Sequence, residues 1–255
     1  MMRTGVACGS ARGLFLGLLA VVLTPHQVAA ADDAVSRAQF EQEHASRDAR
    51  HVADWVVHTR DNYAGDNHAG DQRGLPFVIV DKKDAKVFVF DANGRLRGAA
   101  PALLGLARGD DAVPGIGDRE LSSIRPEEKT TPAGRFVAAL GGNMRGEDVL
   151  WVDYNTATSM HRVLTTNPKE RRLQRLATPT PLDNRISYGC INVPARFFDN
   201  VVRTAFTGAN GIVYVLPETR SAREVFASYD VEEHARVQTA SQPVPAQVAS
   251  GTARH

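Results

Sequence analysis

The spacing of apolar residues first predicts a helix near the start of the chain. Between Ser36 and about Thr59, small and apolar side chains recur on one helical face, with Trp55 beside them: Ala38, Ala45, Ala49, Val52 and Val56. Ser36 with Gln39 three residues later has the form of a capping box. We expect this helix to pack on the domain that follows. The alternative is an arm that binds a partner.

From Leu75 to Pro217 the pattern changes to short apolar runs that are typical of strands. The runs fall at residues 77–80, 86–90, 96, 99–106, 149–154, 159–164 and 211–216, with a tight turn at Asn93-Gly94. A further strand is expected where residues 131–136 lead on through Leu140. Helical spacing returns at Pro194 to Phe206, and residues 168–176 could form a short helix. We therefore predict a mainly β domain, built of two packed sheets with one or two short helices and preceded by the N-terminal helix.

The two ends of the chain differ from this domain. Residues 1–30 combine Arg3 and Arg12 with an apolar run from 14 to 23 and the small residues Val28-Ala29-Ala30, which predicts a signal peptide cut before Ala31. That run is shorter than the roughly 20 residues of a spanning helix, so we expect no stable membrane insertion after cleavage and a periplasmic or secreted protein. Residues 31–73 then form helix and linker, 75–217 the main domain, and 218–255 a short helix capped by Ser221 and Glu224 with a disordered tail.

Charge and composition exclude some classes of function. The net charge is +1, and it becomes −1 without residues 1–30, which contain two arginines and no acidic residue. This balance offers no electrostatic footprint for nucleic acid. His44, His51 and His58 recur every seven residues, and Asp66, His68 and Asp71 lie in the linker. Both sets are conceivable metal ligands, but a solvated helix face and turn chemistry account for them, so we expect no metal and no cofactor.

The stretch Ile186-Ser187-Tyr188-Gly189-Cys190-Ile191-Asn192-Val193-Pro194 has the strongest chemical signal. Cys190 is the only cysteine left after removal of residues 1–30, so no internal disulfide can form. It follows a glycine and precedes the expected helix, whose N-terminus would favour a thiolate. His161 is the only histidine between Leu75 and Pro217. A thiol nucleophile needs such a base, and the pair predicts covalent catalysis; the alternative is a buried, inert cysteine.

These residues resemble the L,D-transpeptidase catalytic domain (YkuD-type) of bacterial cell-wall enzymes. The likeness covers residues 75–217 and rests on three features. They are Thr-Pro-Ala-Gly-Arg-Phe at 131–136, a histidine in the strand at 161, and Ser187-x-Gly189-Cys190-x-Asn192, which is similar to the family signature Ser/Thr-His-Gly-Cys-x-Asn/Arg. The resemblance implies a mixed β-sandwich. It also implies a cysteine that attacks the peptidoglycan tetrapeptide stem at the bond before its D-alanine, and a thioester that an amine or water then resolves.

The resemblance also implies roles for individual residues. Cys190 would be the nucleophile and His161 the general acid and base, with its ring oriented by a neighbouring backbone carbonyl. Amides around Gly189 and Cys190 would stabilise the oxyanion, and Gly189 would let the backbone approach the substrate. Ser187, Tyr188 and Asn192 would be positioning residues, and Arg162 and Arg185 are further candidates for substrate binding.

Three features depart from the family pattern. Tyr188 stands where histidine is most common, Arg162 follows the histidine, and 29 positions separate His161 from Cys190. The residues between them, 165–185, are rich in positive charge and predict either a substrate-binding lid or a solvated helix. Two other functions stay open, namely an L,D-carboxypeptidase or other hydrolase of the same bonds, and a non-catalytic wall-binding module.

Overall fold

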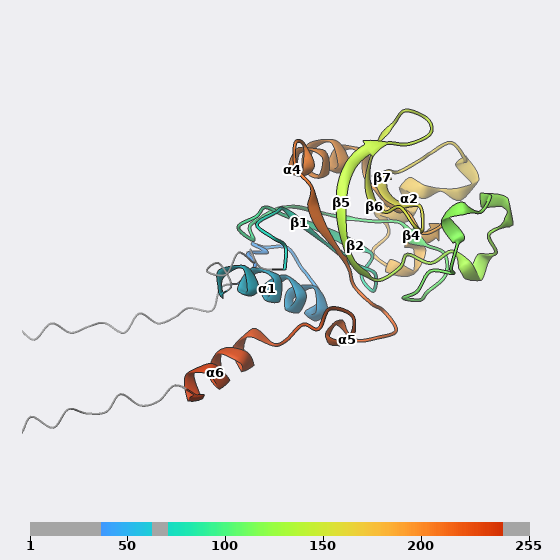
Figure 1. Ribbon diagram of the computed structural model, residues 1–255. Coiled ribbons are helices and arrows are strands. Elements are labelled where there is room, and N and C mark those ends of the chain that lie inside the picture. The colour runs from blue at the N-terminus through green and yellow to red at the C-terminus, as the bar shows by residue number, and fades with distance from the viewer. Residues whose placement is uncertain (1–36, 63–70, 242–255) are drawn as a thin grey trace, which may run out of the picture. The chain divides into compact units, whose positions relative to one another are not determined.

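The computed structural model describes residues 37–62 and 71–241 (Figure 1). The predicted signal peptide, the cap at Ser36, Asp66 and His68 of the linker, and the tail from 242 lie outside the described residues. Within the described ranges, no helix is both long enough and apolar enough to cross a membrane.

The domain is mainly β, as predicted, and its large sheet mixes parallel and antiparallel pairs. The sheet has the order β3-β2-β1-β10-β5-β6-β7-β9, and β4 pairs with β8 in a second, two-stranded sheet. The strands are β1 (Phe77–Asp81), β2 (Lys86–Phe90), β3 (Leu96–Pro101), β4 (Leu104–Gly105), β5 (Gly134–Gly142), β6 (Asp148–Asp153), β7 (Thr158–Arg162), β8 (Arg185–Ser187), β9 (Ile191–Val193) and β10 (Gly211–Val215). The pairs β1–β10, β7–β9 and β4–β8 are parallel, and all the others are antiparallel.

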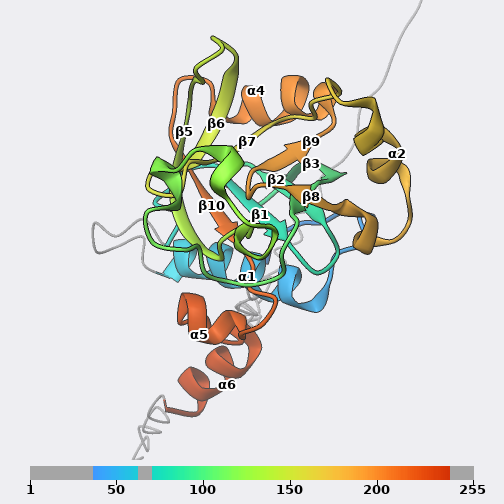
Figure 2. The same cartoon turned by 90° about the vertical axis from the view of Figure 1, so that its right-hand side faces the viewer.

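Both faces of the central strands are buried, which explains their uninterrupted apolar runs. Phe77 and Ile79 of β1 face one core together with α1 (Arg47–Asn62), while Val78 and Val80 face a second core. The second core also takes side chains from β6, β7 and β9 at the other end of the sheet, so the sheet curves around it. Figure 2 shows α1 on one side of these strands and the helical segment that ends in α4 on the other.

That helical segment corresponds to the helix predicted at Pro194 to Phe206. It runs through α3 (Ala195–Phe197), a π-helical turn (Phe198–Val202) and α4 (Arg203–Phe206). Phe198, Val202 and Phe206 are buried in the second core. A short helix also forms in the charged connection, with a 3-10 turn at Pro168–Glu170 followed by α2 (Arg172–Ala177).

The N-terminal helix packs on the sheet as expected, but it starts later than predicted. Gln39 forms a β-bridge with Arg95, so the chain is extended there, and α1 begins at Arg47. The residue that caps it is Ser46, whose hydroxyl accepts a hydrogen bond from the Ala49 amide at 3.1 Å. Ala49, Val52 and Val56 are fully buried against the strands. Packing on the sheet therefore accounts for the apolar face of α1 without a partner protein.

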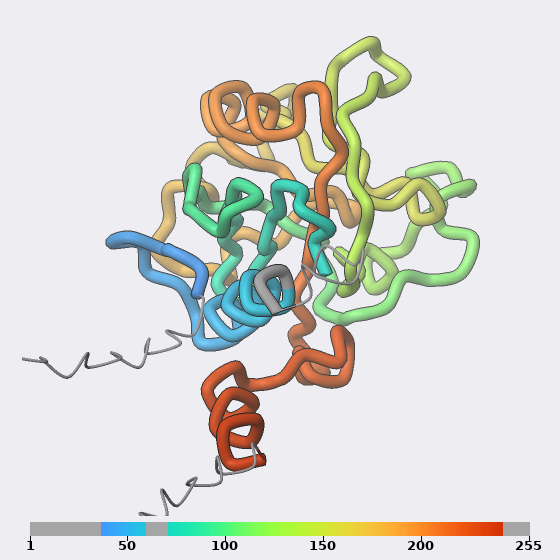
Figure 3. The backbone as a smooth tube through the Cα atoms, turned by 60° about the vertical axis from the view of Figure 1, so that its left-hand side comes forward, coloured from blue at the N-terminus to red at the C-terminus, as the bar shows by residue number. Residues whose placement is uncertain are grey.

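The C-terminal segment covers the histidine face of α1, which the sequence had indicated to be solvated. The chain runs from the sheet into α5 (Ala222–Phe226) and then α6 (Val231–Ser241), beside α1 (Figure 3). His44 is exposed, but His51 contacts the Ser228 hydroxyl at 3.0 Å and His58 is buried near the rings of Tyr229 and His234. Ser221 and Glu224 form the predicted capping box of α5, whereas α6 was not predicted.

Candidate active site

The pairing of β7 with β9 brings the sequence-predicted catalytic residues together. The strands are parallel, with Met160 opposite Ile191 and His161 opposite Asn192. Met160 and Ile191 point into the second core and are fully buried. Because side chains alternate along a strand, Ser159, His161, Asn192 and Cys190 share the other face. The Cys190 sulfur indeed lies 3.7 Å from the Ser159 hydroxyl oxygen.

One ring nitrogen of His161 is held by backbone. Its Nδ1 lies 2.8 Å from the carbonyl oxygen of Arg162, and a carbonyl can only accept, so Nδ1 carries a proton and donates it. The Nε2 atom then faces Asn192, whose side-chain nitrogen is 3.4 Å away. The backbone carbonyl thus fixes the ring and its tautomer, and Nε2 is left to exchange a proton with a reacting group.

The electrostatics of the site favour a charged thiolate–imidazolium pair. Burial disfavours the thiolate of Cys190, but a hydrogen bond and the charge of His161, with hydrogen bonds from Ser159, lower the pKa of the thiol overall. Burial likewise disfavours the imidazolium, yet Cys190 and the Arg162 carbonyl raise the pKa of His161, against the opposing charge of Arg172. Cys190 is partly buried rather than sealed in the core, and it lines a small cavity.

The helix predicted from Pro194 is present, but a three-residue strand separates it from the thiol. Strand β9 follows Cys190 directly, and the helical segment begins only at Ala195. The chain is extended here because β9 is hydrogen-bonded between β7 and Leu103, whose amide and carbonyl both bond to Asn192 at 2.8 Å. The pKa of Cys190 is therefore lowered by His161 and Ser159 rather than by a helix dipole.

The turn that presents Cys190 is held by two buried hydroxyl groups. The Ser187 hydroxyl donates to the Cys190 carbonyl at 2.6 Å and accepts from the Gly189 amide at 3.1 Å. The Thr131 hydroxyl donates to the Gly189 carbonyl at 2.8 Å and accepts from the Gly105 amide at 2.8 Å. Thr131 belongs to the Thr-Pro-Ala-Gly-Arg-Phe motif, which therefore meets the signature turn in space.

Gly189 is required by the backbone itself. Its φ is +138°, and a Cβ there would lie 2.9 Å from the Thr130 carbonyl oxygen. The absence of a Cβ at Gly189 therefore allows the backbone of Thr130 to pack closely against it. The Gly189 amide is already used by Ser187, which corrects the expectation that it would face an oxyanion. Of the two amides predicted to bind the oxyanion, the Cys190 amide is not used by this hydrogen bond.

Asn192 links the site to the charged connection at 165–185. Its buried side chain donates to the Cys190 carbonyl at 3.3 Å and accepts a hydrogen bond from the Arg172 guanidinium at 2.5 Å. Arg175 ties the connection to itself through the carbonyls of Glu170 and Asp183. Lys169 and Arg171 are exposed, as in a solvated helix, while Arg172 is bonded to Asn192; a role of the segment as a lid stays a prediction.

Tyr188 lies at the rim of a small cavity beside the thiol. The cavity has a volume of about 70 Å³, and Tyr188, Gly189 and Cys190 form part of its lining. Tyr188 is 39% exposed, so it is not packed into the core. The ammonium group of Lys129 sits 3.8 Å from the centre of the ring.

The two arginines considered for substrate binding are used inside the protein. Arg162 pairs with Asp148 at 2.8 Å and Asp199 at 2.6 Å. Arg185 pairs with Glu218 at 2.6 Å and donates to the Lys82 carbonyl at 2.8 Å. These ion pairs occupy both guanidinium groups, and the cavity beside the thiol is lined by other residues.

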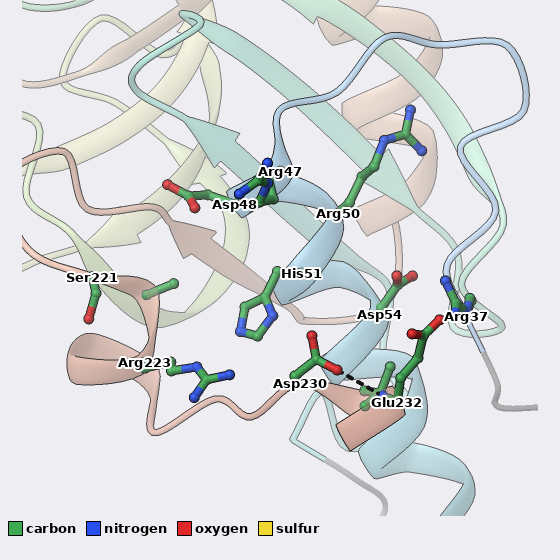
Figure 4. Close-up of a pocket in the computed structure, with 12 residues that line it drawn as sticks. Arg37, Arg47, Asp48, Arg50, His51, Asp54, Ser221, Arg223, Asp230 and Glu232 are labelled. Carbon is green, nitrogen blue, oxygen red and sulfur yellow. Dashed lines mark hydrogen bonds and ion pairs between the residues drawn. The ribbon is translucent and has the colours of Figure 1, made fainter. Parts of the chain in front are cut away.

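A larger cavity, of about 550 Å³, lies between α1 and the start of the C-terminal segment (Figure 4). Side chains of both charges line it, among them His51, Arg223 and Asp230. Asp230 caps α6 by accepting hydrogen bonds from the Glu232 and Glu233 amides, and Arg223 pairs with Glu233 at 3.5 Å. The lining of this cavity does not include Cys190 or His161, the two residues predicted to be catalytic.

Three residues at the site were not singled out from the sequence. Ser159 had a usable signal, because it lies two positions before His161 and a strand places such residues on one face. Thr131 was part of a quoted motif, but its bond to Gly189 joins residues 58 positions apart. Lys129 gave no signal in the sequence, because its contact with Tyr188 depends on the folded loop.

Comparison with known proteins gives structural likeness only. No protein-family model matches the chain, and no curated protein matches it. The catalytic domain of the E. faecium L,D-transpeptidase is similar at 15% identity over 55% of this chain and 95% of that chain, with a TM-score of 0.31.

The L,D-transpeptidase of Xylanimonas cellulosilytica matches at 14% identity over 55% of this chain and 60% of that chain, with a TM-score of 0.35. The helical cell shape determining protein Pgp2 of Campylobacter jejuni matches at 14% identity over 64% and 56%, with a TM-score of 0.37. The match spans only 49–60% of the length of three of the solved L,D-transpeptidase chains. The solved structures named here are thus L,D-transpeptidases and Pgp2.

Proposed function

We propose that the chain is a cysteine-dependent L,D-transpeptidase that acts on peptidoglycan tetrapeptide stems outside the cytoplasm. The observation that carries the proposal is the pairing of Cys190 with His161. The pKa of the thiol is lowered, that of the imidazole is raised, and the ring is fixed through Nδ1. A thiol in such surroundings is a nucleophile rather than a core residue.

The first half of the reaction breaks the bond between the third residue of the stem and its D-alanine. The Cys190 thiolate attacks the carbonyl carbon, and the Cys190 amide stabilises the negative oxygen that forms. His161 donates the proton on Nε2 to the leaving nitrogen, so D-alanine departs as a free amine. The products are a thioester on Cys190 and a neutral His161.

The second half resolves the thioester. An amine of another stem attacks the thioester carbonyl, neutral His161 takes a proton from that amine, and the thiolate leaves. The result is a new amide between two stems and the original thiolate–imidazolium pair. Water in place of the amine would give a tripeptide, which is the reaction of the L,D-carboxypeptidase alternative.

The test is turnover of a disaccharide-tetrapeptide by the purified protein and by its Cys190→Ala and His161→Ala variants. We expect release of D-alanine and formation of a cross-linked dimer by the unaltered protein. Each variant should lose activity by about 10⁴-fold or more, with an unchanged circular dichroism spectrum. Tripeptide as the sole product would indicate the hydrolase. Equal activity in Cys190→Ala would reject the mechanism, and inactivity of all three proteins would favour the non-catalytic wall-binding module.

A further inference from the structure

The side-chain amide of Asn192 is oriented by Arg172, which comes from the long connection between His161 and Cys190. The Arg172 Nη1 atom donates to Asn192 Oδ1 at 2.5 Å, and its Nε atom donates to Glu170 at 2.5 Å. The Arg172 side chain is 12% exposed, and Asn192 is buried. A guanidinium group has donors only, so the amide atom that faces it must be the oxygen.

The amide nitrogen of Asn192 is thereby turned toward the catalytic pair. It lies 3.4 Å from Nε2 of His161 and donates to the Cys190 carbonyl at 3.3 Å. His161 and Asn192 are opposite each other in the parallel register of β7 and β9, so the sheet itself holds the ring and the amide together. Arg172 then decides which end of the amide faces the ring.

This choice matters for the proton that His161 carries on Nε2. An amide nitrogen accepts no hydrogen bond, so the imidazolium proton is left to the Cys190 thiolate or to the leaving amine. An amide oxygen in the same place would accept a hydrogen bond from Nε2 and compete with the sulfur. The rotated amide would also turn its oxygen toward the Cys190 carbonyl oxygen, with no hydrogen between the two.

The charge of Arg172 does not explain why this residue lies near the ring. Burial lowers the pKa of His161, while Cys190 and the Arg162 carbonyl raise it. The charge of Arg172 also lowers that pKa, so it opposes the imidazolium that the reaction needs. The guanidinium group of Arg162 is engaged in two ion pairs. Among the residues that the structure describes, the Asn192 oxygen accepts its side-chain hydrogen bond from Arg172.

We infer that Arg172 is a positioning residue, which acts through the Asn192 amide to direct the proton of His161 toward Cys190 and the leaving amine. The inference rests on the proposed function and deepens it. It also gives the enlarged connection a part in the reaction, because α2 is the element that carries Arg172 to the strand.

The test combines Arg172→Met with Asn192→Ala in a double-mutant cycle. In Arg172→Met, kcat for D-alanine release should fall about 10- to 100-fold while KM stays within about threefold, because the stem is bound but the proton is misdirected. Arg172→Lys keeps a donor for the amide oxygen and should recover most of the loss. In the Asn192→Ala background there is no amide to rotate, so Arg172→Met should lower kcat by less than about twofold further.

Arg175→Met is the matched control, because Arg175 lies in the same helix and bonds to carbonyls of the connection itself. It should leave kcat within about threefold of that of the unaltered protein. Equal losses from Arg172→Met with and without the Asn192 amide would overturn the inference while leaving the proposed function intact. A loss of the same size in Arg175→Met would overturn it as well.

Absence of D-alanine release by the unaltered protein would reject the proposed function, and the pH dependence of Cys190 alkylation then tests the inference without a substrate. Arg172→Met should move the alkylation transition to higher pH, because a proton shared with the amide oxygen stabilises the thiolate less. The Asn192→Ala background should abolish that shift. A shift that persists there would overturn the inference.

Discussion

Thr131 offers the clearest test of how the nucleophile is held in place. Its side chain is fully buried, and its hydroxyl bridges the Gly105 amide and the Gly189 carbonyl, each at 2.8 Å. Thr131→Val keeps the shape of the side chain but leaves both groups without a partner. A buried polar group left unpaired costs about 1–3 kcal/mol, so for two such groups we expect the free energy of unfolding to fall by roughly 2–6 kcal/mol.

The control is Thr131→Ser, which keeps the hydroxyl and removes one methyl group, at a cost of about 1 kcal/mol. Urea unfolding followed by circular dichroism measures both variants, provided that the slope with denaturant is unchanged. In Thr131→Val the rate of Cys190 alkylation at pH 7 should change as well, because the turn before the thiol loses an anchor. The reasoning fails if valine and serine destabilise the protein equally.

Three further perturbations probe the same region. Alkylation of Cys190 should stay fast well below the ordinary thiol pKa of about 8.5 and slow only as pH falls through the lowered value. In His161→Ala only the Ser159 hydrogen bonds still oppose burial, so the transition should move to higher pH; a pH series of iodoacetamide rates would measure it, and an unchanged transition would contradict the pairing. Gly189→Ala should lower the melting temperature and abolish turnover, because its Cβ would lie 2.9 Å from a backbone oxygen; an active, equally stable variant would contradict the φ of +138°. Lys82→Met should lower the free energy of unfolding by about 1–3 kcal/mol in a urea titration, because it removes the buried ammonium 2.9 Å from Asp110, a carboxylate that keeps its backbone amide donors and Arg220 at 3.8 Å; no change in stability would argue against that network.

Elements with a strong local pattern could be predicted from the sequence. The apolar runs of β1 and β2 and the turn at Gly94 were found because strand propensity and turn chemistry agree with the tertiary structure. The helical segment that ends in α4 was found because its buried residues recur at helical spacing. The mutual proximity of Cys190 and His161 followed from chemistry, since each was the only residue of its kind in the domain.

Elements set by distant partners could not be predicted. Strands β8 and β9 have three residues each and exist because β4 and β7 pair with them. The helix predicted from Pro194 was confirmed, but the strand between Cys190 and that helix was missed. The start predicted for α1 was too early for the same reason: Gln39 forms a β-bridge with the distant residue Arg95, so the chain is extended there. The polar face of α1 looked solvated because nothing local announces that the C-terminal segment will cover it.

The most direct measurement is the mass of the protein after a short incubation with a tetrapeptide stem, followed by peptide mapping. A thiolate poised beside His161 should yield an adduct equal to the stem without its D-alanine, attached to Cys190 and cleaved by hydroxylamine as thioesters are. The adduct should be absent in Cys190→Ala and strongly reduced in His161→Ala. An adduct on any other residue, or D-alanine release with no dependence on Cys190, would contradict the account.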